Sequence, residues 1–314
     1  MSVVLVTGAN GFIGRMLCSH LLNMGHSVRA VVRSIDAPLA GIDYVVADLE
    51  SDVPLPPGTL QVDCIYHLAG RAHILSQPTH GALEKFRKAN CEATVRLATR
   101  AQIDGAKRFV FVSSIGVNGA LSKSIPFGER SLPAPHADYA VSKWEAEQAL
   151  RRLVSNGVME LVVVRPPLVY AANAPGNFAR LLRLVSKGLP LPFGKVRNRR
   201  SIVSLRNLVH FLRLCGEHPR APGHVFFPSD GEDVSTAEIV TYLSEGMQKR
   251  VVLFSVPSFL VRWAADLLKR RSLYTQLYGS LRIDHDEARE LLGWTVCETT
   301  SEALRQAGRD YMSR

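Results

Sequence analysis

Hydrophobic positions follow two patterns along this chain. Short runs of apolar, β-forming residues recur through its first half, and between them lie longer stretches in which apolar residues return every three or four positions. A run of the first kind predicts a buried strand, and a stretch of the second kind predicts an amphipathic helix. The predicted strands are residues 3–6, 28–32, 44–46, 64–68, 109–113 and 161–164, and the predicted helices include residues 11–24, 83–102 and 139–156.

The alternation of strands and helices predicts the fold class. Strands separated by helices form parallel sheets with right-handed crossovers, so we expect an α/β fold with a doubly wound Rossmann-type parallel sheet in residues 1–165. After residue 165 the pattern loosens into loops rich in proline and glycine, interspersed with helices. This change predicts a smaller C-terminal substrate lobe in residues 166–314, some segments of which return to the first domain.

A glycine turn, Thr7-Gly-Ala-Asn-Gly-Phe-Ile-Gly14, joins the first predicted strand to the first predicted helix. Its spacing is G-x-x-G-x-x-G. Glycines permit a tight turn and let the backbone approach a pyrophosphate, which the positive end of the following helix attracts. The turn therefore predicts a dinucleotide site at Gly8, Asn10, Gly11, Phe12, Ile13 and Gly14.

The second predicted strand is followed by Arg33 and Ser34, where an NAD-selective site usually places an acidic residue. An arginine there suits a 2′-phosphate, so we predict NADP(H) as the preferred cofactor. NAD(H) stays possible, because Arg33 could instead stack on adenine or point to solvent.

Candidate chemistry lies in Tyr139-Ala-Val-Ser-Lys143, with Ser114 upstream at the end of an apolar run. Residues four apart share a helix face, so the Lys143 ammonium can sit beside the Tyr139 phenol and, with an oxidised nicotinamide, lower its pKa toward the range of an acid/base catalyst. Ser114 would hold the reacting carbonyl or hydroxyl by a hydrogen bond. Taken alone, the pair could equally lie on the surface of an amphipathic helix.

Amino-acid composition restricts the possible partners of this protein more than it restricts the fold. The 314 residues include 38 basic and 28 acidic side chains, for a formal net charge of +10. The basic residues are dispersed and form no stripe interleaved with aromatics, so we expect no nucleic-acid partner. Five scattered cysteines with no C-x-x-C pair argue against a disulfide framework and against a metal site, and fit a reducing cytoplasm. No targeting segment is expected, because the N-terminus lacks the features of a secretory signal.

Residues 251–268 form a strongly apolar run that Pro257, Arg262 and Asp266 interrupt. The interruptions favour a buried or docking helix over a membrane span. Lys269, Arg270 and Arg271 follow directly, and the combination could rest on an anionic membrane surface. We expect instead an ordinary packed helix with a solvated basic end.

Together these motifs resemble the extended short-chain dehydrogenase/reductases, specifically the group of nucleotide-sugar epimerases, dehydratases and reductases, over essentially the whole chain. The resemblance gives Ser114, Tyr139 and Lys143 the catalytic positions, and it implies that Tyr139 and Lys143 also contact the cofactor. In the segment His67-Leu-Ala-Gly70, it implies that Leu68, Ala69 and Gly70 line the cofactor. It further places Asp48 and Leu49 at the adenine, Asn90 near the active site and Pro166 beside the nicotinamide. Trp294, in a C-terminal signature, is expected in the core.

On the substrate side, the resemblance aligns Arg200 with an arginine that binds a diphosphate, although Arg197 and Arg199 lie nearby and could serve instead. Leu168 stands where many relatives carry an asparagine that helps to hold the diphosphate. Asn177 could supply the missing donor, or it could merely cap the next helix. These departures leave the identity of the sugar nucleotide open.

The resemblance implies NADPH-dependent reduction at C4 of a UDP-linked 4-keto-6-deoxy-N-acetylhexosamine for bacterial surface-polysaccharide synthesis. A UDP-sugar 4-epimerase with tightly bound NAD would use the same three catalytic residues and remains an alternative. A reductase of flavonoid- or steroid-like carbonyls, and a non-catalytic protein that senses the dinucleotide, are further alternatives. We expect a homodimer formed through the helices that contain Leu97 and Ala146.

Overall fold

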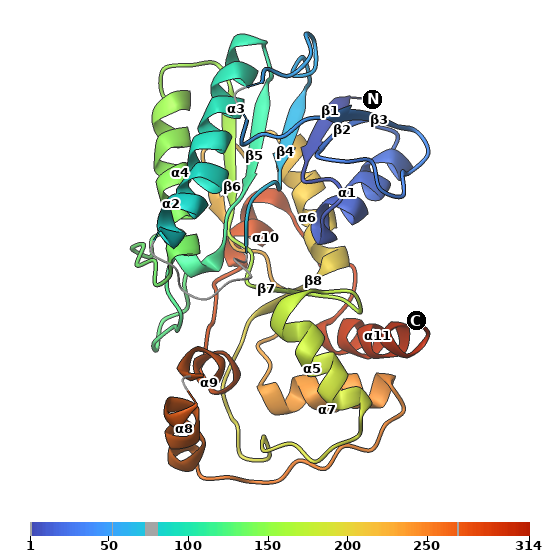
Figure 1. Ribbon diagram of the computed structural model, residues 1–314, viewed down its shortest axis with the longest axis vertical. Helices are drawn as coiled ribbons and strands as arrows, with labels where there is room; N and C mark the ends of the chain where they lie inside the picture. Colours follow the sequence, from blue (N-terminus) through green and yellow to red (C-terminus); the bar gives the residue numbers. More distant parts are fainter. Residues whose placement is uncertain (1, 52, 73–80, 269) are drawn as a thin grey trace.

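The computed structural model describes residues 2–51, 53–72, 81–268 and 270–314. A seven-stranded parallel sheet of order β3-β2-β1-β4-β5-β6-β9 forms its upper part (Figure 1). The strands are β1 (Val3–Thr7), β2 (Ser27–Val32), β3 (Ile42–Val46), β4 (Cys64–His67), β5 (Arg108–Val112), β6 (Glu160–Val164) and β9 (Val225–Phe226). The predicted fold class is confirmed, and each of the six predicted strands lies in this sheet with ends displaced by at most two residues.

Helices cover both faces of the sheet because successive strand residues point to opposite sides. Val4 and Val6 pack in a cluster with residues of α1 (Phe12–Asn23), α6 (Leu205–Glu217) and α10 (Asp286–Leu292), whereas Leu5 packs with residues of α3 (Ala93–Ile103) and α4 (Asp138–Val154). Two buried layers, one on each face, therefore fix the strand ends at which the pocket forms. Trp294 lies in the first layer with 2% of its surface exposed, which confirms its predicted core position.

The predicted helix 83–102 is one continuous helical segment with an irregular middle. It consists of α2 (Ala82–Arg87), a π-helical turn η1 (Lys88–Glu92) and α3. A π turn adds one residue to the helical repeat and commonly marks a functional site. A short 3₁₀ turn, η2 (Ile115–Val117), follows β5 directly after Ser114.

The lower part of the molecule is built mostly from residues after 165 (Figure 1). It contains a two-stranded parallel sheet and five helices: β7 (Leu168–Tyr170), β8 (Ile202–Ser204), α5 (Gly176–Ser186), α7 (Thr236–Gly246), α8 (Ser258–Leu267), α9 (Arg271–Tyr278) and α11 (Thr300–Met312). Residues of α5, α7 and α11 share a separate hydrophobic cluster. Other late segments, namely α6, β9 and α10, pack on or within the large sheet.

Helix α8 corrects the expectation of an ordinary packed helix in residues 251–268. None of its ten residues, all of which the structure describes, is buried. In the described part of the chain, no helix combines the length and the apolarity needed to cross a membrane.

Candidate active site

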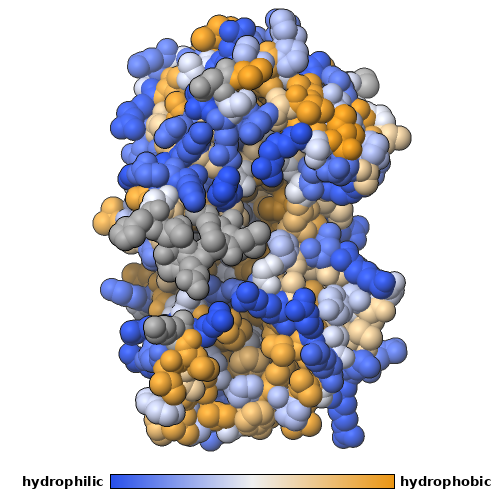
Figure 2. Space-filling view, viewed as in Figure 1, coloured by the Kyte–Doolittle hydropathy of each residue, from blue (hydrophilic) through white to orange (hydrophobic). Residues whose placement is uncertain are grey.

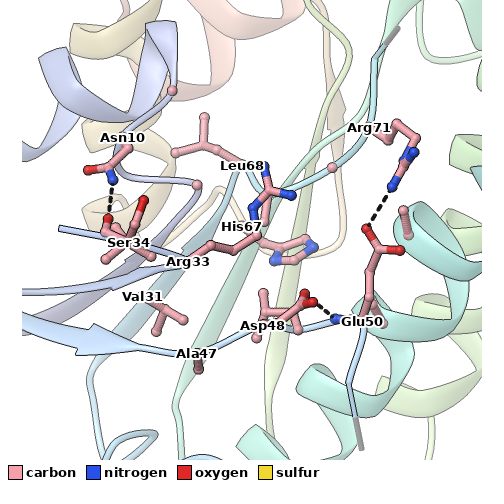
Figure 3. A pocket seen from close by; sticks show the side chains of 18 of the residues that line it. Asn10, Val31, Arg33, Ser34, Ala47, Asp48, Glu50, His67, Leu68 and Arg71 are labelled. Atoms are coloured by element: carbon pink, nitrogen blue, oxygen red, sulfur yellow. Dashed lines mark hydrogen bonds and ion pairs between the residues drawn. The ribbon is translucent and has the colours of Figure 1, made fainter. Parts of the chain in front are cut away.

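A pocket of about 620 Å³ lies beyond the carboxyl ends of β1, β2 and β4 (Figure 3). Parallel α/β sheets place their ligand crevice at this edge. Nine of the predicted cofactor residues line it: Gly8, Asn10, Gly11, Arg33, Asp48, Leu49, Leu68, Ala69 and Gly70.

The glycine turn leaves no room for side chains at two positions. Gly8 has φ +68°, and a Cβ added there would lie 2.8 Å from the backbone nitrogen of Ala69. A Cβ on Gly14 would meet the carbonyl oxygen of Gly8. Helix α1 then begins at Phe12, and among the described residues no side chain caps its first turn, so its free N–H groups remain available for a phosphate.

The wall beyond β2 combines positive and negative side chains. Arg33 is exposed and extends into the pocket, and Asn10 donates from Nδ2 to the carbonyl of Ser34 at 2.6 Å (Figure 3). The hydroxyl of Ser34 in turn donates to Asp36 at 2.6 Å. A 2′-phosphate could pair with Arg33, while ribose hydroxyls could donate to Asp36.

Three charged lining residues were not predicted from the sequence: Asp36, Glu50 and Arg71. Glu50 and Arg71 form an ion pair at 3.4 Å across the pocket (Figure 3). Asp36, Glu50 and Arg71 follow Arg33, Asp48 and Gly70 by three, two and one residues, and this closeness in the sequence was the only available signal.

Other predicted cofactor residues lie outside this lining. Phe12 faces a second cleft that Arg15 and Tyr170 also line. Ile13 packs against the core, and the carbonyl of Pro166 accepts a hydrogen bond from the N–H of Ile115 at 3.1 Å. Pro166 thereby joins the end of β6 to the turn that follows Ser114.

Asn90, in the π turn, is fully buried and joins two walls of the site. Its Oδ1 accepts from the Arg71 N–H at 2.7 Å, and its Nδ2 donates to the Arg71 carbonyl at 3.1 Å and to the Ser142 hydroxyl at 3.0 Å. Ser142 lies between Tyr139 and Lys143 on α4, so Asn90 fixes the loop after β4 against the helix that carries the candidate catalytic pair.

Lys143 is buried at the end of β5, next to the pocket. Its Nζ donates to the Val112 carbonyl at 3.0 Å, lies 4.6 Å from the centre of the Phe111 ring, and would be 3.4 Å from a Cβ on Gly70. Burial lowers the pKa of Lys143 to about 8, and the negative charge of Glu147 partly opposes this shift. The amino group thus lies between the strand end that leads to Ser114 and the wall of the pocket.

Tyr139 is half-buried and contacts the Phe86 ring edge-on, with ring centres 6.0 Å apart. Burial raises the pKa of its phenol to about 12. The expected lowering of the Tyr139 pKa by Lys143 together with an oxidised nicotinamide is not met in the protein alone, where loss of solvation is the cause of the shift. At neutral pH the phenol holds its proton.

Ser114 lies close to the start of α4. A Cβ on Gly116 would be 3.4 Å from both the Ser114 hydroxyl and the Ala140 methyl group. The Ser114 oxygen accepts from the Gly116 N–H at 3.1 Å, and in the described ranges its own proton is given to no acceptor. The hydroxyl is therefore available as a donor beside the residue that follows Tyr139.

Behind these residues lies a buried ionic network. Arg165 donates to both carboxylate oxygens of Glu147, at 2.9 and 2.5 Å, and to Oδ1 of Asn118 at 3.0 Å. Ser113 donates to the same carboxylate at 2.5 Å. Glu147 lies one helical turn beyond Lys143, so the network anchors α4 to β5 and β6 directly behind the amine.

His67 connects β1, β4 and the π turn without carrying charge. The Thr94 hydroxyl donates to the Asn90 carbonyl at 2.8 Å, so it accepts from Nε2 of His67 at 2.9 Å. The Thr7 hydroxyl accepts from the Ala69 N–H at 3.2 Å, so it donates to Nδ1 at 2.8 Å. Burial lowers the pKa of His67 to about 3, with a further contribution from Lys143, so its role here is structural.

The lower lobe places Arg200 and Asn177 differently. Arg200 is largely buried, burial lowers its pKa, and its Nη1 donates to the Gly279 carbonyl at 2.9 Å. Arg199 is exposed and donates to the Asp233 carbonyl. Asn177 is exposed within α5 and donates to Gln276 of α9, whereas the N-cap position of α5 is Pro175. Asn177 is thus no helix cap.

Residues 4–227 match the family described as the NAD dependent epimerase/dehydratase family. The chain belongs to this family. The matched part runs from β1 to just beyond β9 and includes the glycine turn, Ser114, Tyr139 and Lys143. This family member is therefore an NAD(P)-dependent oxidoreductase or epimerase, as the sequence predicted.

Relatives of this family member extend the comparison over its whole length. The UDP-glucose 4-epimerase of Vibrio cholerae is 36% identical over 98% of this chain and 95% of its own. A 4-hydroxy-2-methyl-3-oxo-4-farnesyl-3,4-dihydroquinoline-1-oxide ketoreductase of Stigmatella aurantiaca is 29% identical over 96% of each chain. The solved structure of MoeE5 in complex with UDP-glucose and NAD is 25% identical, with a TM-score of 0.74 over 99% of this chain and 98% of MoeE5. Both epimerases and reductases thus share this framework.

Proposed function

We propose that this protein transfers a hydride at C4 of a nucleotide-linked sugar, with Ser114, Tyr139 and Lys143 as its catalytic residues. The position of Lys143 carries the proposal: its buried amine touches the end of β5, two residues before Ser114, and lies beside Gly70 of the dinucleotide-type pocket. The 36% identity to a UDP-glucose 4-epimerase supports a UDP-linked sugar.

In the direction of reduction, each residue has a distinct task. The nicotinamide supplies the hydride when it is bound. The Ser114 hydroxyl donates a hydrogen bond to the carbonyl oxygen, and Tyr139 delivers a proton to that oxygen as it becomes an alkoxide. A phenol whose pKa is raised to about 12 holds its proton at neutral pH, which suits an acid. Lys143 would hold the nicotinamide ribose when the cofactor is bound, and its positive charge would stabilise the phenolate that remains.

Within this class we infer the NADPH-dependent reduction of a UDP-linked 4-keto-6-deoxy-N-acetylhexosamine. Arg33 supports NADPH, because it is exposed in the pocket at the end of β2, where a 2′-phosphate would lie. Arg200 supports a diphosphate, because its guanidinium is largely buried and its hydrogen bond goes to a neutral carbonyl.

A second candidate is a UDP-sugar 4-epimerase that keeps NAD bound and returns the hydride to the opposite face of the sugar. The Vibrio cholerae relative favours it. Asp36, which lies beside Arg33 in the pocket, also suits the ribose hydroxyls of NAD.

The deciding experiment follows NADPH absorbance with UDP-linked 4-keto sugars, in wild type and in Tyr139→Phe. We expect consumption of NADPH by the wild type and a kcat lowered by about 10²–10⁴-fold in the variant, because the proton donor is lost. Arg33→Ser should raise the KM for NADPH about tenfold and leave that for NADH nearly unchanged, as expected for loss of one phosphate contact.

Two results would overturn parts of this proposal. Undiminished turnover by Tyr139→Phe would remove the phenol as the acid. Release of NAD from the purified, denatured protein, together with interconversion of UDP-glucose and UDP-galactose without added cofactor, would establish the epimerase instead.

A further inference from the structure

The surface of α8 is strongly apolar on one side. Phe259, Trp263 and Leu267 are 67%, 66% and 68% exposed. They lie four residues apart, so they share one helix face, and the exposed Leu260 lies beside them. Figure 2 shows hydrophobic residues gathered at the lower left, over the part of the molecule that Figure 1 labels α8. We call these four residues the α8 face.

Basic residues flank the α8 face in the sequence. Residues 258–271 contain four basic side chains and one acidic side chain, and of the basic residues Lys269 lies outside the described residues. Arg262 and Arg270 are exposed, and within the described ranges neither forms an ion pair. Arg271 pairs only loosely with Asp266, at 3.9 Å. The border of the apolar stripe thus carries Arg262 and the acidic Asp266 within α8, and Arg270 and Arg271 just beyond its end, so its net charge is positive.

We propose that the α8 face docks this protein onto the surface of an anionic lipid bilayer. A short helix that carries Trp, Phe and Leu on one side and arginines at its border lies in the plane of the headgroups, where the rings enter the acyl boundary and the guanidinium groups contact lipid phosphates. The net charge of +10 on the whole protein adds attraction at longer range.

A second copy of this chain fits the face less well. A symmetric contact between two α8 faces would bring the unpaired Arg262 and Arg270 of both copies together, and like charges at an interface oppose association. A bilayer of anionic lipids supplies both an apolar interior and negative charge at its border. Both requirements of the face are then met by one partner.

Docking would hold the substrate lobe at the membrane. Helix α8 packs against α9, and Gln276 of α9 bonds to Asn177 of α5. The residues that line the dinucleotide pocket lie between Gly8 and Ala93, and none of them belongs to α8 or α9. The bilayer contact therefore leaves the cofactor site open.

Sedimentation with vesicles tests the proposal. The full chain is mixed with vesicles of phosphatidylcholine alone, or of phosphatidylcholine with phosphatidylglycerol at about three to one, and the bound fraction is measured. We expect binding to the anionic vesicles only, weakened about fivefold for each arginine removed in Arg262→Gln and Arg270→Gln. Phe259→Ser combined with Trp263→Ser should weaken binding about tenfold or more, because two inserted rings are lost.

The controls separate docking from general stickiness and from misfolding. Leu132→Ser removes another highly exposed leucine far from α8 in the sequence and should bind like the wild type. The altered side chains are exposed, so NADPH binding and melting temperatures should match those of the wild type. The emission of Trp263 should shift to the blue on anionic vesicles, and the shift should be absent in Trp263→Phe.

Three outcomes would overturn the proposal. Equal binding to neutral and anionic vesicles would remove the role of charge. Undiminished binding by the variant that lacks Phe259 and Trp263 would remove the α8 face. Formation of a wild-type dimer that this variant loses, without any vesicle binding, would show that a second copy covers the face.

Discussion

At the residue scale, burial shifts the pKa values of the proposed catalytic pair more than mutual proximity does. The sequence placed Lys143 one turn from Tyr139 and predicted that the amine would lower the pKa of the phenol. In the structure, burial moves each pKa toward the neutral form, to about 8 for the lysine and about 12 for the tyrosine. Helical spacing could predict the shared face, but the solvation of each group depends on Phe86, Phe111 and Gly70, which lie elsewhere in the sequence.

Replacing Lys143 tests how much the burial of its charge lowers the free energy of unfolding. Below pH 8 the lysine is charged in both the folded and the unfolded chain, and holding the buried charge destabilises the fold. Between about pH 8 and 10.5 only the unfolded chain keeps the proton, so the stability of the wild type rises with pH across that window. We expect Lys143→Met to raise the free energy of unfolding at pH 7 by about 1–3 kcal/mol and to remove that rise.

Urea unfolding across the pH window measures this effect. Lys123→Met is the matched control, because Lys123 is exposed and its loss removes no buried charge. The prediction is wrong if the Lys143 variant unfolds more easily than the wild type at pH 7. Whether or not Lys143→Met is the more stable protein, it should lose hydride-transfer activity. Lys143 would then be needed for catalysis while its buried charge lowers the free energy of unfolding.

At the element scale, the periodic parts of the fold were predictable and the irregular parts were not. The six longer strands and the glycine turn could be predicted because hydrophobic spacing and local backbone demands determine them. The strand β9 has two residues, too few for any pattern, and the π turn has the composition of an ordinary helix. Likewise, the apolar residues of α8 predicted burial, yet none of them is buried by the described part of the chain.

The ionic network that anchors α4 yields a prediction at this scale. Glu147→Gln would leave the buried guanidinium of Arg165 without its counter-charge, so we expect the free energy of unfolding to fall by about 3–5 kcal/mol. The pKa of Lys143 should fall further, because the Glu147 charge raises it. Denaturant unfolding measures the first effect, and the pH dependence of kcat measures the second.

A double variant shows whether the charge pair itself is responsible. Glu147→Leu with Arg165→Met removes both charges and keeps the volume filled, so it should be more stable than Glu147→Gln. If the double variant is the less stable of the two, the hydrogen bonds of the network, rather than its unpaired charge, determine the loss.

At the scale of the whole molecule, segments from the late part of the chain return to the large sheet and pack against segments from the early part. Three distant stretches, namely the loop before α4, the residue before β9 and helix α10, bring Glu129, His224 and Glu287 together. The two glutamates also line a cleft. Nδ1 of His224 lies 3.5 Å from a carboxylate oxygen of each glutamate. No local pattern could predict such a cluster, because it depends on the return of segments after residue 165 to the large sheet.

We expect this cluster to make the stability of the protein depend on pH. Burial, followed by the hydrogen bond and the charge of Glu129, raises the pKa of Glu287 to about 7 from an ordinary value of 4.5. The folded protein therefore holds a proton that the unfolded chain releases, and the stabilisation is complete below about pH 4.5 and is lost as the pH rises through 7. Glu287→Gln keeps a neutral side chain at every pH, so its melting temperature relative to the wild type should rise across this window. Glu290→Gln, on the exposed side of the same helix, is the control, and its melting temperature should follow that of the wild type at every pH. If the melting temperature of Glu287→Gln also follows the wild type, the shared proton does not hold α10 against the loop before α4.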